Sequence, residues 1–109
     1  MNNVAYKNKT DFQVTTIKFT RYEISSRHGY IILEVEQGTK RGVIYGPFIN
    51  WSNWRENFER VLILEVTAVA REIGCEIIST GANPEAKLQE VYRSLGFAEM
   101  SNGTFFAEL

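Results

Sequence analysis

The segment AVAREIGCEIIST, residues 68–80, joins the end of an amphipathic helix to a short apolar strand through one glycine. The helical pattern begins at Trp54 and ends at Ile73. Its apolar face carries Phe58, Leu62, Val66, Val69 and Ile73. Gly74 favours the end of the helix, because glycine readily adopts the left-handed conformation that closes one. Residues 75–80 are mostly apolar, which is typical of a central strand.

The flanking sequence extends this pattern in both directions. Strands are predicted at 12–24, 30–36 and 41–49, then a helix from Asn83-Pro84-Glu85 to about Leu95, then strands at 97–100 and 104–109. Asn83 is the predicted N-cap of the second helix. The order β-β-β-α-β-α-β-β predicts an α+β fold with a mixed, α/β-like sheet. The strands on either side of the long helix should be parallel, and Gly46-Pro47 should bulge the first of them or end its pairing.

Length and composition exclude several classes of protein. At 109 residues we expect a flexible N-terminus over 1–11 and a single domain over 12–109. A net charge of −1 without a basic block argues against nucleic-acid binding. One histidine and one cysteine, Cys75, argue against a metal site and fit a reducing compartment. The absence of an apolar start or a long apolar run predicts a cytoplasmic protein outside the membrane.

A family resemblance appears in two stretches. The segment 68–80 resembles the end of the cofactor helix, and the strand after it, in the GCN5-related N-acetyltransferase (GNAT) superfamily. VYRSLGF, residues 91–97, is similar to the family's pattern of Tyr, two residues and Leu-Gly-Phe. The resemblance covers roughly residues 30–109. It implies a compact GNAT-like fold and acyl transfer from acetyl-CoA to an amine.

The same resemblance implies residue roles. Tyr92 matches the tyrosine that donates a proton to the leaving thiolate, and its phenol, with an ordinary pKa of about 10, is protonated at neutral pH. The alternative is that Tyr92 packs its ring on the core with its hydroxyl at the rim. Phe48 and Ile49 lie on the bulged strand whose backbone binds the pantetheine arm in the family.

The cofactor loop departs from the family pattern. In the family, glycines in this loop let backbone amides approach the pyrophosphate of CoA. The matching window in this chain, Trp54–Glu59, contains no glycine. We expect Arg55, Asn57 and Phe58 to contact any cofactor there. Two carboxylates, Glu56 and Glu59, take the phosphate position, and Asn53 with Glu56 resembles a capping box that satisfies the helix amides internally. The window therefore predicts weak or impaired CoA binding.

The general base is less clearly marked. Glu34 shares one face of a strand with Glu36, and two neighbouring carboxylates can raise each other's pKa. Glu34 is our candidate base. The alternative is that both carboxylates lie on a solvated strand face.

Three large aromatic side chains, Phe48, Trp51 and Trp54, fall within seven residues. If exposed, the two tryptophans would form an interface for a homodimer or a protein partner; if buried, they would plug the cofactor cleft. Three hypotheses remain: an acetyl-CoA-dependent N-acyltransferase, a non-catalytic interaction module of the same fold, and an unrelated α+β binding domain.

Overall fold

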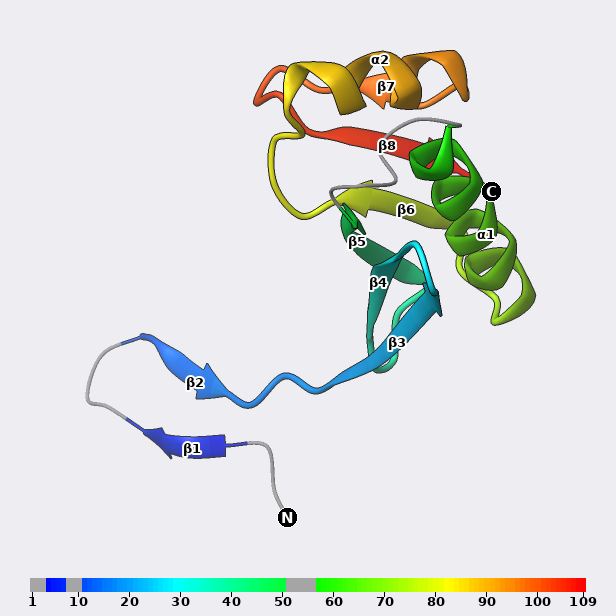
Figure 1. Ribbon diagram of the computed structural model, residues 1–109. Coiled ribbons are helices and arrows are strands. Elements are labelled where there is room, and N and C mark those ends of the chain that lie inside the picture. Colours follow the sequence, from blue (N-terminus) through cyan, green and yellow to red (C-terminus); the bar gives the residue numbers. More distant parts are fainter. Residues whose placement is uncertain (1–3, 8–10, 51–56) are drawn as a thin grey trace.

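The computed structural model describes residues 4–7, 11–50 and 57–109. Two sheets are present in these residues (Figure 1). Strands β1 (Val4–Lys7) and β2 (Gln13–Thr15) pair as an antiparallel ribbon, which lies apart from the main sheet. The larger sheet has six strands and carries the two helices.

The main sheet has the strand order β3-β4-β5-β6-β8-β7. Its elements are β3 (Phe19–Ser26), β4 (Gly29–Glu36), β5 (Arg41–Ile49), α1 (Phe58–Glu72), β6 (Ile77–Thr80), α2 (Ala86–Ser94), β7 (Ala98–Glu99) and β8 (Phe105–Glu108). Only β5 and β6 pair in parallel, and every other neighbouring pair is antiparallel. The predicted α+β class and the parallel pair around the long helix are both confirmed.

Both helices pack on the same face of this sheet. Alternate residues of the strands point toward them and form one buried cluster, which includes Leu33, Ile44, Ile78 and Phe105. Helix α1 contributes a stripe at helical spacing: Leu62, Ile63, Val66 and Ala70. In the described part of the chain neither helix covers the opposite face, where Phe19, Tyr30, Tyr45 and Phe48 are exposed. No described helix is long and apolar enough to cross a membrane.

Several element boundaries differ from the sequence prediction. The strand predicted over 12–24 is divided into β2 and β3, and β1 forms inside the segment 1–11, whose flexibility remains a prediction. Helix α1 starts at Phe58 rather than at residue 54, because Asn57 has a left-handed backbone with φ of 59° that a helix cannot continue through. The N-cap of α2 is Glu85, so the prediction of Asn83 was wrong by two residues.

Candidate functional site

Strands β5 and β6 separate where the parallel pairing ends. Their register runs from Arg41 opposite Ile77 to Ile44 opposite Thr80, and the amide of Gly81 donates a hydrogen bond to the Ile44 carbonyl at 2.8 Å. Strand β5 then continues to Ile49, paired with β4 but no longer with β6. Its edge toward β6 is therefore unpaired over its last five residues.

A bulge coincides with this separation. Across the β4–β5 pair, Tyr30 lies opposite Phe48 and Ile32 opposite Tyr45, so β5 carries one extra residue at Gly46-Pro47. Gly46 has φ of +104°, a conformation that side-chain-bearing residues rarely adopt. Bulges of this kind bend a strand and redirect its side chains. The prediction that Gly46-Pro47 bulges the strand is confirmed.

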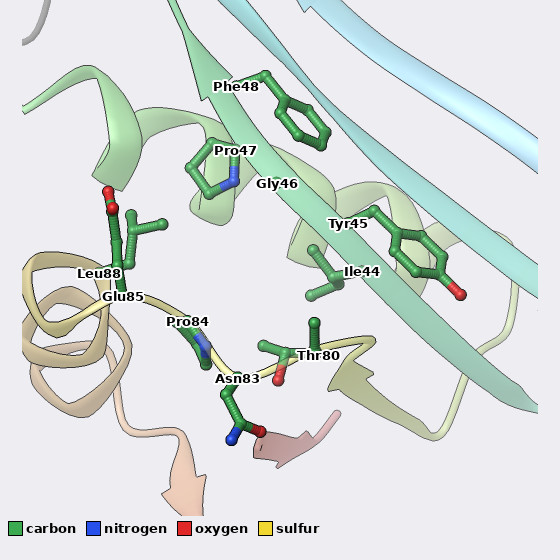
Figure 2. A pocket seen from close by; sticks show the side chains of 11 residues that line it. Ile44, Tyr45, Gly46, Pro47, Phe48, Thr80, Asn83, Pro84, Glu85 and Leu88 are labelled. Atoms are coloured by element: carbon green, nitrogen blue, oxygen red, sulfur yellow. The ribbon is translucent and has the colours of Figure 1, made fainter. Parts of the chain in front are cut away.

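A cavity of about 410 Å³ occupies the gap between the separated strands (Figure 2). One wall is β5 from Ile44 to Phe48, and the other is the end of β6 with the chain that leads into α2. Asn83 and Glu85 supply polar groups, whereas Pro47 and Leu88 supply apolar surface. The cavity lies beyond the carboxyl ends of the two parallel strands, where ligands bind in open sheets with helical crossovers.

Tyr92 lies beside this cavity. Its side chain is fully buried, with its ring stacked on Phe105 at 5.8 Å and edge-on to Phe97 at 5.0 Å between centroids. The hydroxyl donates a hydrogen bond of 3.3 Å to the carbonyl of Gly46, which lines the cavity. Burial raises the pKa of Tyr92 well above its usual range, so the phenol remains protonated at neutral pH. The ring packing considered from the sequence is therefore present, but the hydroxyl is buried against Gly46 rather than placed at the rim, and its role as a proton donor stays a prediction.

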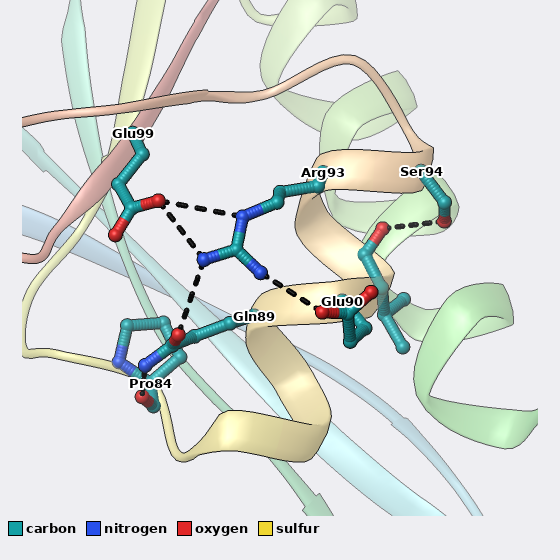
Figure 3. Close-up of polar contacts among 7 residues, drawn as sticks. Pro84, Gln89, Glu90, Arg93, Ser94 and Glu99 are labelled. Atoms are coloured by element: carbon teal, nitrogen blue, oxygen red, sulfur yellow. Dashed lines mark hydrogen bonds and ion pairs between the residues drawn. The ribbon is translucent and has the colours of Figure 1, made fainter.

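The end of helix α2 is held in place by a polar network around Arg93 (Figure 3). Its guanidinium pairs with Glu99 of β7 at 2.9 Å and with Glu90 at 3.0 Å. The hydrogen bond to Glu99 raises the pKa of Arg93 above its usual value. The guanidinium also lies 5.5 Å from the centre of the Phe105 ring. These contacts fix the helical turn that carries Tyr92 against β7 and β8.

The predicted cofactor contacts fall in different places. Phe48 lines the cavity and lies against Tyr30, with 4.9 Å between ring centroids, whereas Ile49 packs against the core outside the cavity. Asn57 is the N-cap of α1, but its side chain makes no capping hydrogen bond. Phe58 stacks on His28 at 4.2 Å.

Three residues singled out from the sequence lie outside the described residues. They are Arg55, Trp51 and Trp54. The capping box of Asn53 with Glu56 also falls there. The cofactor and interface roles assigned to these residues stay predictions.

Glu34 lies on the face of the sheet opposite the helices. Its carboxylate pairs with Arg21 of the neighbouring strand at 2.7 Å. Glu34 lies opposite Val43, three residues before Gly46, which is about 10 Å along a strand. The structure therefore does not bring Glu34 to the cavity wall, and its role as a base stays a prediction.

Glu59 is more deeply buried than its window position indicated. We expected it, with Glu56, at the position where phosphates bind in the family; only 5% of its surface is exposed and it heads the buried stripe of α1, and its effect on a phosphate stays a prediction. Among the residues that the structure describes, its Oε2 atom has no hydrogen-bond partner. The buried residues of α1 at positions 59, 62, 63 and 66 follow helical spacing. A predicted apolar face starting at residue 59 instead of residue 58 would have included Glu59.

Comparisons with known proteins identify structures that share this fold. No family model matches the sequence, and no curated protein matches it significantly. An acetyltransferase from Bacillus cereus has a similar structure, with 17% identity, a TM-score of 0.65, and coverage of 85% of this chain and 74% of that one. An acetyltransferase from Bacillus subtilis in complex with CoA has 16% identity, a TM-score of 0.66, and coverage of 84% and 77%.

An anti-CRISPR protein is also similar, with 23% identity and a TM-score of 0.61 over 81% of this chain and 98% of that one. These solved structures share the mixed sheet and its helices with the present chain, at identities too low to carry over an activity. The chain therefore has the fold of the GCN5-related N-acetyltransferases.

Proposed function

We propose that this domain transfers an acyl group, such as acetyl, from a CoA-type thioester to an amine. The observation that carries the proposal is the bulged strand β5, which leaves β6 after Ile44 and opens a cavity beside the Tyr92 hydroxyl. Structural similarity to acetyltransferases, one of them in complex with CoA, supports it.

The residues around the cavity fit the thioester end of such a donor. Beyond Ile44, the edge of β5 that faces the cavity is not paired with β6; its backbone groups there exclude the Gly46 carbonyl, which accepts from Tyr92, and an N–H at Pro47, which has none. A pantetheine arm carries amide groups that can pair with the remaining groups in the manner of an added strand. When bound, the donor supplies an activated acyl group and a thiolate leaving group.

Tyr92 is the group that would protonate the leaving thiolate. Its hydroxyl is held at Gly46 by a hydrogen bond of 3.3 Å, which is long for two oxygen atoms. A stronger acceptor nearby can therefore take this proton without a large loss of protein contacts. Its raised pKa keeps the proton in place across the neutral range.

The phosphate end fits less well. Residues 54–59 contain no glycine, and the first turn of α1 carries the buried carboxylate of Glu59. We therefore propose that CoA binds weakly through its phosphates and mainly through its arm. For the base we retain Glu34, which would have to act through water because it lies away from the cavity wall.

Release of free thiol from acetyl-CoA in the presence of a panel of amines tests this function directly. The wild type should turn over at least one amine, and Tyr92→Phe should lower kcat about a hundredfold. Tyr22→Phe is a matched control, since Tyr22 is half-buried on β3 and does not line the cavity. No thiol release with any amine at high enzyme concentration would contradict the proposal.

A second candidate function is a non-catalytic interaction module, and the uncovered face of the sheet favours it. A groove of about 520 Å³ on this face is lined by Phe19, Val43 and Met100 together with Glu36 and Arg41. Neither of these two charged side chains forms an ion pair with another described residue. A second copy of the chain, related by a two-fold axis, would offer Arg41 to Glu36 and Glu36 to Arg41, so we propose a homodimer through this face.

Sedimentation of the full chain distinguishes this arrangement from others. The proposed homodimer predicts that Arg41→Glu dissociates the dimer. The double variant Arg41→Glu with Glu36→Arg should restore it. A wild type that stays monomeric at high concentration would contradict the proposal. A dimer sensitive instead to Trp51→Ala and Trp54→Ala would move the interface to the predicted tryptophan pair.

A further inference from the structure

Three aromatic rings lie at the mouth of the cavity, on the face of the sheet that the helices leave uncovered. Tyr30, Tyr45 and Phe48 are all exposed there. Tyr45 and Phe48 project to the same side of β5, opposite to Pro47, and both line the cavity (Figure 2). Tyr30 lies opposite Phe48 in the sheet, and their ring centroids are 4.9 Å apart. Tyr30, Tyr45 and Phe48 therefore form an aromatic platform beside the cavity.

The platform is held in place by its surroundings. A Cβ atom at Gly81 would lie 2.3 Å from Cε1 of Tyr45, so this ring lies directly on the backbone that follows β6. Ile32, opposite Tyr45, faces away from the helices, because Ile31 and Leu33 on either side belong to the cluster beneath them. Ile32 is nevertheless only 5% exposed. The side chains around it on the uncovered face therefore pack over it.

An unpaired carboxylate lies next to the platform. Glu23 of β3 is opposite Ile32, which in turn is opposite Tyr45. Glu23 is exposed and forms no ion pair with another described residue. The next carboxylate along this face, Glu34, is paired with Arg21 at 2.7 Å, so that pair adds no net charge. Among the described residues, Glu23 therefore gives this end of the face its negative charge.

This combination of groups is suited to an organic cation. The faces of aromatic rings carry partial negative charge and attract ammonium groups, and a carboxylate adds a full negative charge. An uncharged ligand would gain from the rings but not from Glu23. Neighbouring strands are about 4.8 Å apart, so Glu23 on β3 is about 10 Å from β5 and the cavity. A cation beside Glu23 is therefore too far away to be an amine that reacts in the cavity.

We propose that the aromatic platform and Glu23 bind a non-reacting ammonium group of the acceptor, whose reacting amine lies about 10 Å away in the cavity. This inference rests on the proposed function, which places the reacting amine near Tyr92. The bound ammonium group orients the acceptor and takes no part in acyl transfer. A long free diamine and a lysine-rich peptide both present this chemistry.

Binding of choline to the full chain, followed by NMR chemical shifts, tests the cation site without any reaction. Choline carries a quaternary ammonium group, and dimethylbutanol is its uncharged analogue with carbon in place of nitrogen. The wild type should bind choline at least about fivefold more tightly than dimethylbutanol. Glu23→Gln and Tyr30→Leu should each lower choline affinity about threefold or more. Glu108→Gln and Phe19→Leu are matched controls, because both residues are exposed on the same sheet away from the platform.

Gly81→Ala is a further variant that keeps every side chain of the site. Its methyl group displaces the Tyr45 ring, so choline affinity should fall while the NMR spectrum remains that of a folded domain. Equal wild-type affinities for choline and dimethylbutanol would overturn the inference. Unchanged choline affinity in both Glu23→Gln and Tyr30→Leu would also overturn it.

Acceptor kinetics separate this inference from the proposed function. Thiol release from acetyl-CoA is measured with an eight-carbon diamine, an eight-carbon monoamine and a lysine-rich peptide. KM should be about fivefold lower for the diamine than for the monoamine, and Glu23→Gln should remove this difference with kcat unchanged. A KM lower still for the peptide would identify a protein as the source of the two amines, and the reverse order would identify a free diamine.

The two failures give different results. If no amine supports thiol release but choline binding depends on Glu23 and Tyr30, the proposed function fails and the cation site stands. If thiol is released and KM is the same for the diamine and the monoamine, the proposed function stands and the inference about the acceptor fails.

Discussion

Replacing Tyr92 with phenylalanine separates the contribution of its hydroxyl from that of its ring. The variant loses one hydrogen bond, to the Gly46 carbonyl at 3.3 Å, and keeps the ring contacts with Phe97 and Phe105. A hydrogen bond contributes about 0.5–1.5 kcal/mol to stability, and the long distance places this one near the lower limit. We therefore expect the melting temperature to fall by only about 2–4 °C.

The expected effect on catalysis is much larger. Loss of a general acid lowers the rate by about a hundredfold or more, which corresponds to about 2.7 kcal/mol of activation free energy. This exceeds the predicted stability change roughly fivefold, so partial unfolding cannot account for it. Tyr92→Ala supplies the contrast, because removal of a buried aromatic ring costs about 3–5 kcal/mol of stability.

The assay pairs thermal melting with kcat for thiol release on the same preparations. A Tyr92→Phe variant that melts as expected but keeps its kcat would refute the proton-donor role and leave Tyr92 as a packing residue. A fall in melting temperature as large as that of Tyr92→Ala would show that the hydroxyl, and not the ring, holds the helix in place.

Four further outcomes follow from the structure. Burial raises the pKa of Tyr92 in the folded state above its unfolded value of about 10. The protonated phenol therefore contributes its full free energy of stabilisation below about pH 10, and this contribution is lost as the pH rises further. Alkaline melting curves should therefore show less destabilisation in Tyr92→Phe than in the wild type. Saturating acetyl-CoA should raise the wild-type melting temperature by about 2 °C or less, whereas a strong site at a hundred times its dissociation constant would give on the order of 10 °C. Gly42→Ala should destabilise the domain by about 1–3 kcal/mol in denaturant titrations, because its new methyl group would lie 2.7 Å from Cδ1 of the buried Leu33; unchanged stability would mean that this side chain can move aside. Glu34→Gln should lower kcat about a hundredfold if Glu34 is the base, and an unaltered pH–rate profile would remove it from that role.

The sequence was most informative where local chemistry and burial agree. Gly74 and Gly96, both with positive φ, follow the helices as predicted. The apolar strand after Gly74 pairs in parallel with β5, since a helical crossover leaves little alternative. Helix α1 was predicted to begin at residue 54 because the composition there is compatible with a helix, whereas the structure starts it at Phe58, after the left-handed backbone of Asn57.

The candidate site was predictable in part. Gly46-Pro47 indicated the bulge, and the resemblance of residues 91–97 to the family pattern singled out Tyr92, whose hydroxyl bonds the Gly46 carbonyl. The burial of Glu59 was not predicted, because carboxylates rarely lie on the apolar face of a helix and composition argues against it. The pairing of Glu34 with Arg21 depends on the register of β3 against β4, which alternation alone leaves undetermined.

The short parallel pairing between β5 and β6 also bears on how the chain folds. Strands β3, β4 and β5 are joined by tight turns and can pair early, because their contacts are close in sequence. The four paired positions that join β5 to β6 instead require closure of a segment that includes all of α1. We therefore expect the β5–β6 pairing beside the cavity to form late in folding, after helix α1 has docked on β4 and β5. The amides of this pairing should be among the first in the sheet to exchange with solvent.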